Sequence, residues 1–149
     1  MAELSGKKIL VLVTNQGVEQ DELKVPLEKL RADGAEVTVA APETGEVKSL
    51  VGDWDRGETF PVDQTISSVN ESEYDLLLLP GGTLNADALR LDQDAQKTAK
   101  AFASSGRPVA ALCHGPWLLV ETGLVDGKTL TSYPSVKTDI VNAGGNWVD

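Results

Sequence analysis

The stretch Pro108–Pro116 reads Pro-Val-Ala-Ala-Leu-Cys-His-Gly-Pro, and it decides how the rest of the chain is interpreted. The apolar run before Cys113 is typical of a short strand, and Gly115 followed by Pro116 is typical of a tight turn into the first turn of a helix. A cysteine at such a junction is held above the end of a sheet, in the geometry of a nucleophile elbow. Free N–H groups and the positive end of the helix dipole favour the thiolate there. We therefore predict that Cys113 is reactive, although a lone cysteine is more often a small buried hydrophobic residue.

Length and composition restrict the class of protein. The 149 residues suffice for one domain with a hydrophobic core, so we expect a single domain over residues 1–149. The one cysteine excludes an intrachain disulfide, and the first eight residues have no signal-peptide pattern. No apolar run has the length of a membrane span, so a cytoplasmic protein without a membrane partner is expected. The net charge of −10 argues against binding to a nucleic-acid backbone.

Apolar runs alternate with helical patterns along the chain. Strands are predicted at 8–13, 36–41, 74–79 and 108–112. One helix is predicted where Leu23, Leu27 and Leu30 recur at helical spacing, with Glu22 early in it and Gly34 at its end, and another at 92–105, closed by Gly106. This order predicts an α/β fold: a doubly wound, mostly parallel sheet with helices on both faces. Residues 42–70 break the pattern, and they are interpreted either as a hairpin with loops over the sheet edge or as an oligomer contact.

The loops that follow three of these strands carry unusual residues. Ligands bind beyond the carboxyl ends of parallel strands, so the loops after Val13, Leu79 and Leu112 should converge. Gly81 and Gly82 can bring backbone N–H groups close to an oxyanion, although a glycine pair is also typical of a simple turn.

Glu22 belongs to the first of these loops. Placed in a cleft near the cysteine, a desolvated carboxyl would keep its proton and hydrogen-bond the sulfur or move a proton to substrate. The alternative is a solvated acidic face.

His114 is the only histidine, and this limits the mechanisms. A glutamine amidotransferase needs a histidine far downstream of its cysteine, so that activity is excluded. His114 is a candidate base, or it orients the loop or an interface. The chain also lacks the glycine-rich patterns of nucleotide phosphate binding, Gly-x-x-x-x-Gly-Lys and Gly-x-Gly-x-x-Gly.

Four motifs together resemble the PfpI family of intracellular cysteine peptidase-like and general stress proteins, which are relatives of the parkinsonism-associated protein deglycase. The motifs are Leu79–Gly82, Ala110–Pro116, Thr131–Ser135 and Asn142–Gly144. The resemblance implies a flavodoxin-like or class I glutamine-amidotransferase-like fold, a homodimer or hexamer, and no metal or organic cofactor. Peptidase, glyoxalase, deglycase and redox-protective roles occur among the members.

The resemblance also implies roles for individual residues. Cys113 matches the family nucleophile and Glu22 the glutamate that contacts its sulfur. Gly82, beside Gly81, and the backbone of His114 match the oxyanion donors, and the His114 side chain matches the histidine of the peptidase-like members. The peptidase-like members take a glutamate from a neighbouring subunit. At the matching position this chain has Ala86, and Asp87 is the next residue. Asp87 and Glu19 are accessory candidates.

These arguments predict a cysteine-dependent, stress-protective enzyme that acts on a small reactive carbonyl, such as methylglyoxal, or on a protein modified by one. The alternatives are an intracellular cysteine peptidase or amidase, and a redox sensor or chaperone-like protein that works through Cys113 oxidation. The chain ends at Asp149, where family members continue through a further strand and helix, so we expect these two elements to be absent.

Overall fold

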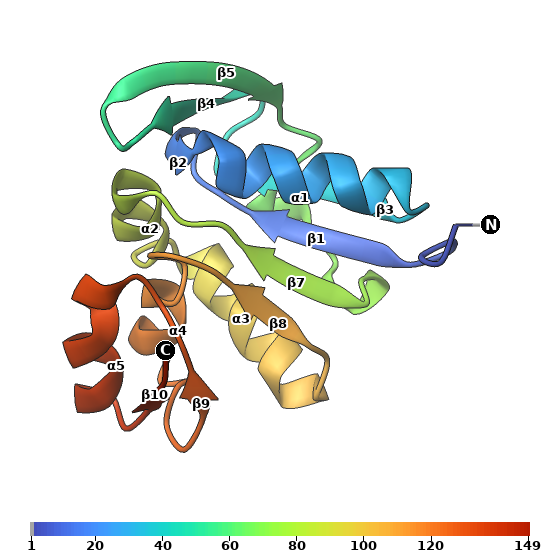
Figure 1. Ribbon diagram of the computed structural model, residues 1–149. Helices are drawn as coiled ribbons and strands as arrows, with labels where there is room; N and C mark the ends of the chain where they lie inside the picture. Colours follow the sequence, from blue (N-terminus) through green and yellow to red (C-terminus); the bar gives the residue numbers. More distant parts are fainter. Residues whose placement is uncertain (1) are drawn as a thin grey trace.

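The computed structural model describes residues 2–149 and is built around a five-stranded parallel sheet (Figure 1). Its strand order is β6-β3-β1-β7-β8, and every neighbouring pair is parallel. These strands are β1 (Lys8–Leu12), β3 (Glu36–Ala41), β6 (Gln64–Thr65), β7 (Leu76–Leu79) and β8 (Val109–Ala111). The four predicted strands are confirmed, with ends that differ by at most two residues.

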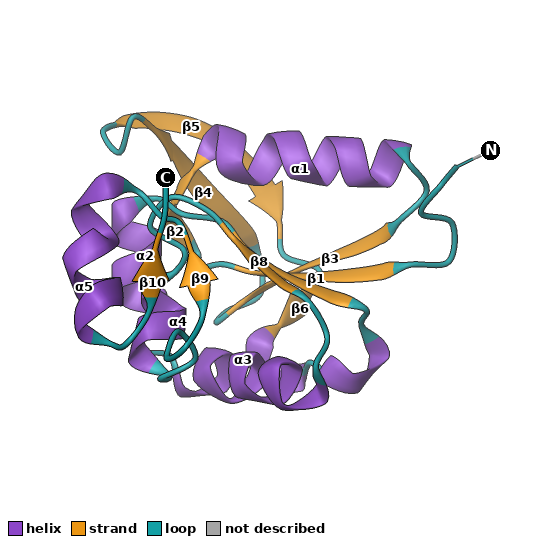
Figure 2. Ribbon diagram, turned by 60° about the horizontal axis from the view of Figure 1, so that its bottom comes forward, coloured by secondary structure: helices purple, strands orange, loops and turns teal. Residues whose placement is uncertain are grey.

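Apolar residues on both faces of the sheet explain why it is covered twice (Figure 2). In β1, Ile9 and Val11 belong to the core cluster that includes Leu23 and Leu27 of helix α1 (Gln20–Ala32). Leu10 and Leu12 belong to the other cluster, with helix α3 (Gln93–Ser105). Since alternate side chains of a strand point to opposite faces, a continuous apolar run needs cover on both. The predicted doubly wound α/β fold is confirmed.

Helix α3 shows why its prediction from sequence succeeds. The Asp92 side chain accepts a hydrogen bond from the Ala95 N–H at 2.8 Å, which caps the start of the helix. Gly106 ends it in the left-handed conformation, with φ of 75°. Between the caps, Ala95, Ala99 and Phe102 are buried against the sheet. Caps and apolar spacing therefore indicate the same element.

A second sheet lies beside the first and was only partly predicted. Its strands are β2 (Gln16–Glu19), β4 (Glu46–Val51) and β5 (Asp55–Pro61), in the order β2-β4-β5. The antiparallel pair β4–β5 confirms the hairpin interpretation of residues 42–70. Strand β2 was expected to be loop, because four residues with one buried apolar side chain, Val18, carry no strand pattern. It exists because β4 pairs with it.

The remaining elements are short. They are helices α2 (Thr83–Leu89), α4 (Trp117–Glu121) and α5 (Lys137–Asn142), strands β9 (Thr129–Leu130) and β10 (Asn146–Trp147), and three turns of 3-10 helix, Ile66–Ser68, Glu71–Glu73 and Pro134–Val136. Two-residue strands and five-residue helices are too short for a periodic signal in the sequence. Among residues 2–149, no helix is long and apolar enough to cross a membrane.

Asn85 joins two of the loops at the carboxyl end of the main sheet. Its side chain is fully buried in α2. Its Oδ1 accepts hydrogen bonds from the Thr14 N–H at 2.7 Å and the Thr14 hydroxyl at 3.0 Å. Its Nδ2 donates to the Gly81 carbonyl at 2.9 Å. One amide thus fixes the loop after β1 against the turn after β7.

We predict that Asn85→Ala lowers the free energy of unfolding by about 2–4 kcal/mol, because it leaves the buried Thr14 N–H and Gly81 carbonyl without a partner. Urea denaturation measures the change. The matched control is Asn142→Ala at an exposed position of α5, which should stay within about 0.5 kcal/mol of wild type. Equal effects of the two substitutions would contradict the structural role of Asn85.

Candidate active site

Cys113 lies in the turn between β8 and α4, and its backbone is in the left-handed conformation, with φ of 56°. This region is costly for residues other than glycine, and such residues cluster at functional sites. The Tyr133 N–H donates to the Cys113 carbonyl at 2.8 Å, and the Gly115 N–H donates to Leu112 at 2.8 Å. These bonds hold the strained turn, and they leave the thiol half-buried at the surface of a cleft.

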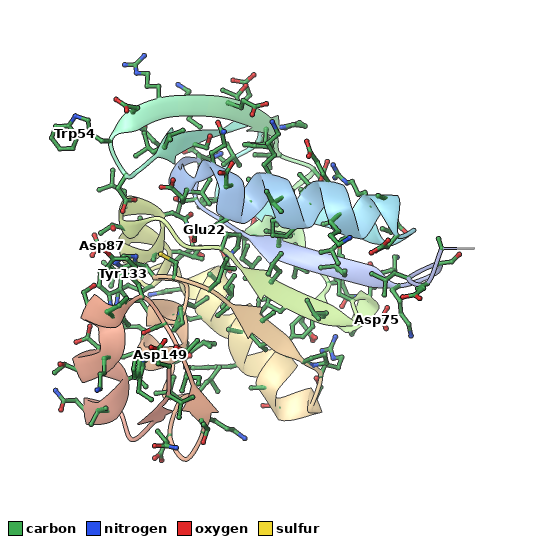
Figure 3. All side chains as sticks on the ribbon, in the orientation of Figure 1. Glu22, Trp54, Asp75, Asp87, Tyr133 and Asp149 are labelled. Atoms are coloured by element: carbon green, nitrogen blue, oxygen red, sulfur yellow. The ribbon has the colours of Figure 1, made fainter. Side chains whose placement is uncertain are left out.

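Glu22 reaches this thiol from the first turn of α1 (Figure 3). Its Oε1 accepts a hydrogen bond from the Gly81 N–H at 2.8 Å. A methyl group added at Gly81 would collide with this same oxygen and with the Cβ of Cys113. Gly81 is therefore required for the close approach of the carboxyl to the thiol.

The two glycines of the turn after β7 have different tasks. The Gly81 N–H is engaged by Glu22, whereas the backbone N–H groups of Gly82 and His114 are directed to the sulfur of Cys113. Gly82 has φ of 86°, and a side chain there would meet the backbone of Gly17 and Glu19. Gly82 and His114 thus each place a backbone N–H against the sulfur.

Cys113 and Glu22 compete for one proton. Burial raises the pKa of the thiol to about 11, and the charge and hydrogen bond of Glu22 add to this effect. Burial also raises the pKa of Glu22, while its hydrogen bonds with Cys113 and the Gly81 N–H lower it. Since two negative charges in contact repel each other, the pair holds one proton at neutral pH. This rise runs against the thiolate predicted from the start of a helix, because burial and the Glu22 carboxylate disfavour a charged sulfur.

His114 is buried beside the thiol. Its Nδ1 lies 3.3 Å from the sulfur of Cys113. The Tyr133 ring stacks on the imidazole with centroids 4.6 Å apart, and the Trp117 ring meets it edge-on at 5.2 Å. Burial lowers the pKa of His114, and the carboxylate of Asp53 opposes this shift. The imidazole is therefore neutral at pH 7 and can accept a proton.

The two accessory candidates lie in different places. Both oxygens of Glu19 accept backbone N–H groups, from Gly52 at 2.8 Å and from Asp53 at 3.1 Å. Glu19 thus holds the tip of the β4–β5 hairpin at the cleft. Asp87 is exposed on α2 and does not line the cleft.

Asp53, Thr83 and Tyr133 were not predicted as site residues, although Tyr133 lies in the motif Thr131–Ser135, and all three line the cleft with Cys113. Asp53 has φ of 60°, and its carboxylate accepts hydrogen bonds from the Thr83 N–H at 2.9 Å and the Thr83 hydroxyl at 2.7 Å. The neighbouring Trp54 projects from the hairpin tip into solvent (Figure 3). The cleft has a volume of about 390 Å³, large enough for a small carbonyl compound or a modified side chain.

No group of three or more histidine, cysteine, aspartate or glutamate side chains in residues 2–149 is arranged to hold a metal ion. The chemistry that the described groups can perform is attack by sulfur and proton transfer by Glu22 or His114.

We predict that His114 titrates below its ordinary pKa of 6.5, because burial disfavours the imidazolium. As the only histidine, it gives one Cε1 proton resonance, so a pH series of NMR spectra measures the midpoint directly. Asp53→Asn should lower the midpoint further. The unfolded chain binds this proton more tightly than the folded one, so stability should fall as pH drops below 6.5. A midpoint at or above that of the urea-unfolded chain would contradict the burial.

Comparison with known proteins shows what this arrangement resembles. The model of the DJ-1/PfpI family matches residues 7–149. Deglycase PH1704 of Pyrococcus horikoshii is 39% identical over 142 residues, which cover 95% of this chain and 81% of that protein. A putative cysteine protease of Bacillus subtilis, YraA, is 41% identical over 143 residues, covering 96% and 81%. The crystal structure of Drosophila melanogaster DJ-1beta superimposes with a TM-score of 0.84 at 32% identity, covering 96% of this chain and 74% of that one. The chain therefore belongs to the DJ-1/PfpI family.

Proposed function

We propose that this protein is a cysteine-dependent enzyme that protects cells under stress by converting reactive carbonyls, such as methylglyoxal, or their adducts on proteins. The observation that carries the proposal is the Glu22 carboxyl, hydrogen-bonded to Gly81 at 2.8 Å and placed against the Cys113 thiol. The relative Deglycase PH1704, 39% identical, supports the same class of chemistry.

The first step is attack of sulfur on the aldehyde carbon of methylglyoxal. Glu22 takes the thiol proton as the S–C bond forms, and its raised pKa makes it a stronger base than an ordinary carboxylate. The N–H groups of Gly82 and His114 stabilise the oxyanion that develops. Return of the proton to this oxygen gives a hemithioacetal on Cys113, and Glu22 is again ionised.

The second step moves a proton between neighbouring carbons. Ionised Glu22 removes the hydrogen of the former aldehyde carbon, which gives an enediolate, and then delivers that proton to the adjacent carbon. The hydroxyl proton of the first carbon passes to the oxygen of the second. The aldehyde carbon is oxidised and the ketone carbon reduced, so the product is a lactoyl thioester without any external oxidant. Water then cleaves the thioester to lactate and restores the thiol. No metal or organic cofactor takes part in these steps.

We expect wild type to convert methylglyoxal to lactate with saturation kinetics, measured by following lactate formation. Cys113→Ala should abolish turnover, because no nucleophile remains. Glu22→Gln should lower kcat by about 100-fold or more, because the amide cannot transfer the proton. The matched control is Glu28→Gln at an exposed position of the same helix, which should behave as wild type. Consumption of one methylglyoxal per protein without turnover would reject the proposal.

A second candidate is a peptidase or amidase, favoured by the distance of 3.3 Å between the Cys113 sulfur and His114 Nδ1. In this reading His114 takes the thiol proton and later protonates the leaving amine. The relative named as a putative cysteine protease is consistent with it.

His114→Gln separates the two candidates, because only the peptidase reaction needs an ionisable imidazole. If the carbonyl proposal is right, His114→Gln retains lactate formation within about fivefold of wild type. A peptidase predicts that wild type cleaves a fluorogenic peptide and that His114→Gln loses this cleavage. Asp87→Ala should leave both activities unchanged, since Asp87 is exposed and outside the cleft.

A further inference from the structure

Three carboxylates line the cleft that holds the Cys113 thiol. Glu19, Glu22 and Asp53 are three of the nine residues that line it, and none of the nine is lysine or arginine. His114 adds no compensating charge, because burial lowers its pKa and leaves it neutral. An electrophile that reaches the sulfur therefore enters a field of negative charge.

These carboxylates are held in place without positive partners. Glu19 and Glu22 accept backbone N–H groups, and Asp53 accepts the N–H and hydroxyl of Thr83. The ion pairs in the described part of the chain lie elsewhere: Lys24–Glu58, Arg31–Asp63, Arg90–Glu121 and Arg107–Glu71. Hydrogen bonds from neutral groups fix the positions of the three charges but leave the charges uncancelled.

Resting on the proposed carbonyl chemistry, we propose that the Cys113 cleft accepts neutral and positively charged electrophiles and excludes anionic ones, with Asp53 as the residue that sets this selectivity. The substrate class is then narrower than reactive carbonyls in general. It comprises uncharged dicarbonyls and carbonyl adducts on lysine or arginine side chains that keep a positive charge. Carbonyl compounds that carry a carboxylate, such as glyoxylate, fall outside it.

Asp53 is assigned this role because the other two carboxylates have further tasks. Glu22 shares its proton with Cys113, so its charge changes during the reaction. Both oxygens of Glu19 are turned to the hairpin backbone. Asp53 lies at the tip of the hairpin, and its charge reaches both Glu22 and His114, whose pKa values it raises. Its strained backbone, with φ of 60°, and its two bonds to Thr83 keep it facing the cleft.

The test uses Cys113 itself as the probe, because it is the only thiol in the chain. Trimethylammonioethyl and sulfonatoethyl methanethiosulfonate carry the same reactive group and opposite charges. Each forms a disulfide with the thiol and releases methanesulfinate. For each reagent, the second-order rate constant with the protein is divided by the rate constant of the same reagent with mercaptoethanol. The value for the cationic reagent is then divided by the value for the anionic one. The pKa of the Cys113 thiol affects both values equally, so it cancels in this cation-to-anion ratio. Intact mass spectrometry follows the reaction.

We expect a normalised cation-to-anion ratio of about 10 or more at low salt for wild type, falling as salt screens the charges. Asp53→Asn should lower the ratio at least about threefold. Asparagine tolerates a positive φ and can keep both bonds to Thr83, so the hairpin should retain its position. The net-charge control is Asp94→Asn, exposed on α3 and outside the cleft, which should leave the ratio unchanged. A ratio near 1 in wild type, or equal changes in the two variants, would overturn the proposal.

The experiments distinguish failure of the proposed carbonyl reaction from failure of the proposed charge selectivity. Loss of methylglyoxal turnover with an intact cation-to-anion ratio would reject the carbonyl reaction and keep the charge selectivity of the cleft. Turnover of phenylglyoxal and of 4-carboxyphenylglyoxal, two 2-oxoaldehydes that differ by one carboxylate, with equal kcat/KM would reject the selectivity and keep the reaction. In Asp53→Asn, kcat/KM for 4-carboxyphenylglyoxal should rise relative to phenylglyoxal by about threefold or more.

Discussion

The hydrogen bond from the Gly81 N–H to Glu22 Oε1, 2.8 Å long, is the contact on which the site depends. It joins α1 to the turn after β7, and it directs the carboxyl to a thiol that comes from a third loop, after β8. Only glycine leaves room for this approach, since any side chain at position 81 would displace either the carboxyl or the thiol. Burial of the pair then forces it to hold one proton, and this couples the attack of the sulfur to the proton transfer by Glu22 in the proposed reaction.

The parallel sheet explains why these groups meet. The carboxyl ends of β1, β7 and β8 point the same way, so the loops that follow them form one cluster (Figure 1). Asn85 fixes two of these loops with a single buried amide. The second sheet adds a wall to the cluster, because Glu19 at the end of β2 holds the hairpin tip and thereby places Asp53 beside the thiol. The acidic character of the cleft thus comes from the packing of two sheets.

The features that could be predicted from the sequence are those set by interactions between residues close together in the chain. Strand β3 was predicted with its observed bounds, and α3 to within one residue, because local apolar spacing and local caps determine them. The approach of Glu22 to Cys113 was expected from the family resemblance, whereas spacing alone left a solvated acidic face open. Asp53 could not be found, since its place depends on the pairing of β2 with β4 and on a bond to Thr83, 30 residues away. The thiol pKa also escaped prediction, because burial and the neighbouring carboxylate outweigh the short helix α4.

The central claim, that Cys113 forms the covalent adduct and Glu22 moves the proton, is tested most directly by NMR with carbon-13-labelled methylglyoxal. The account predicts that wild type yields labelled lactate. Glu22→Gln should instead accumulate the labelled hemithioacetal on Cys113 with little lactate, and Cys113→Ala should show neither species. Lactate formed by Glu22→Gln at the wild-type rate, or by Cys113→Ala at all, would contradict the account.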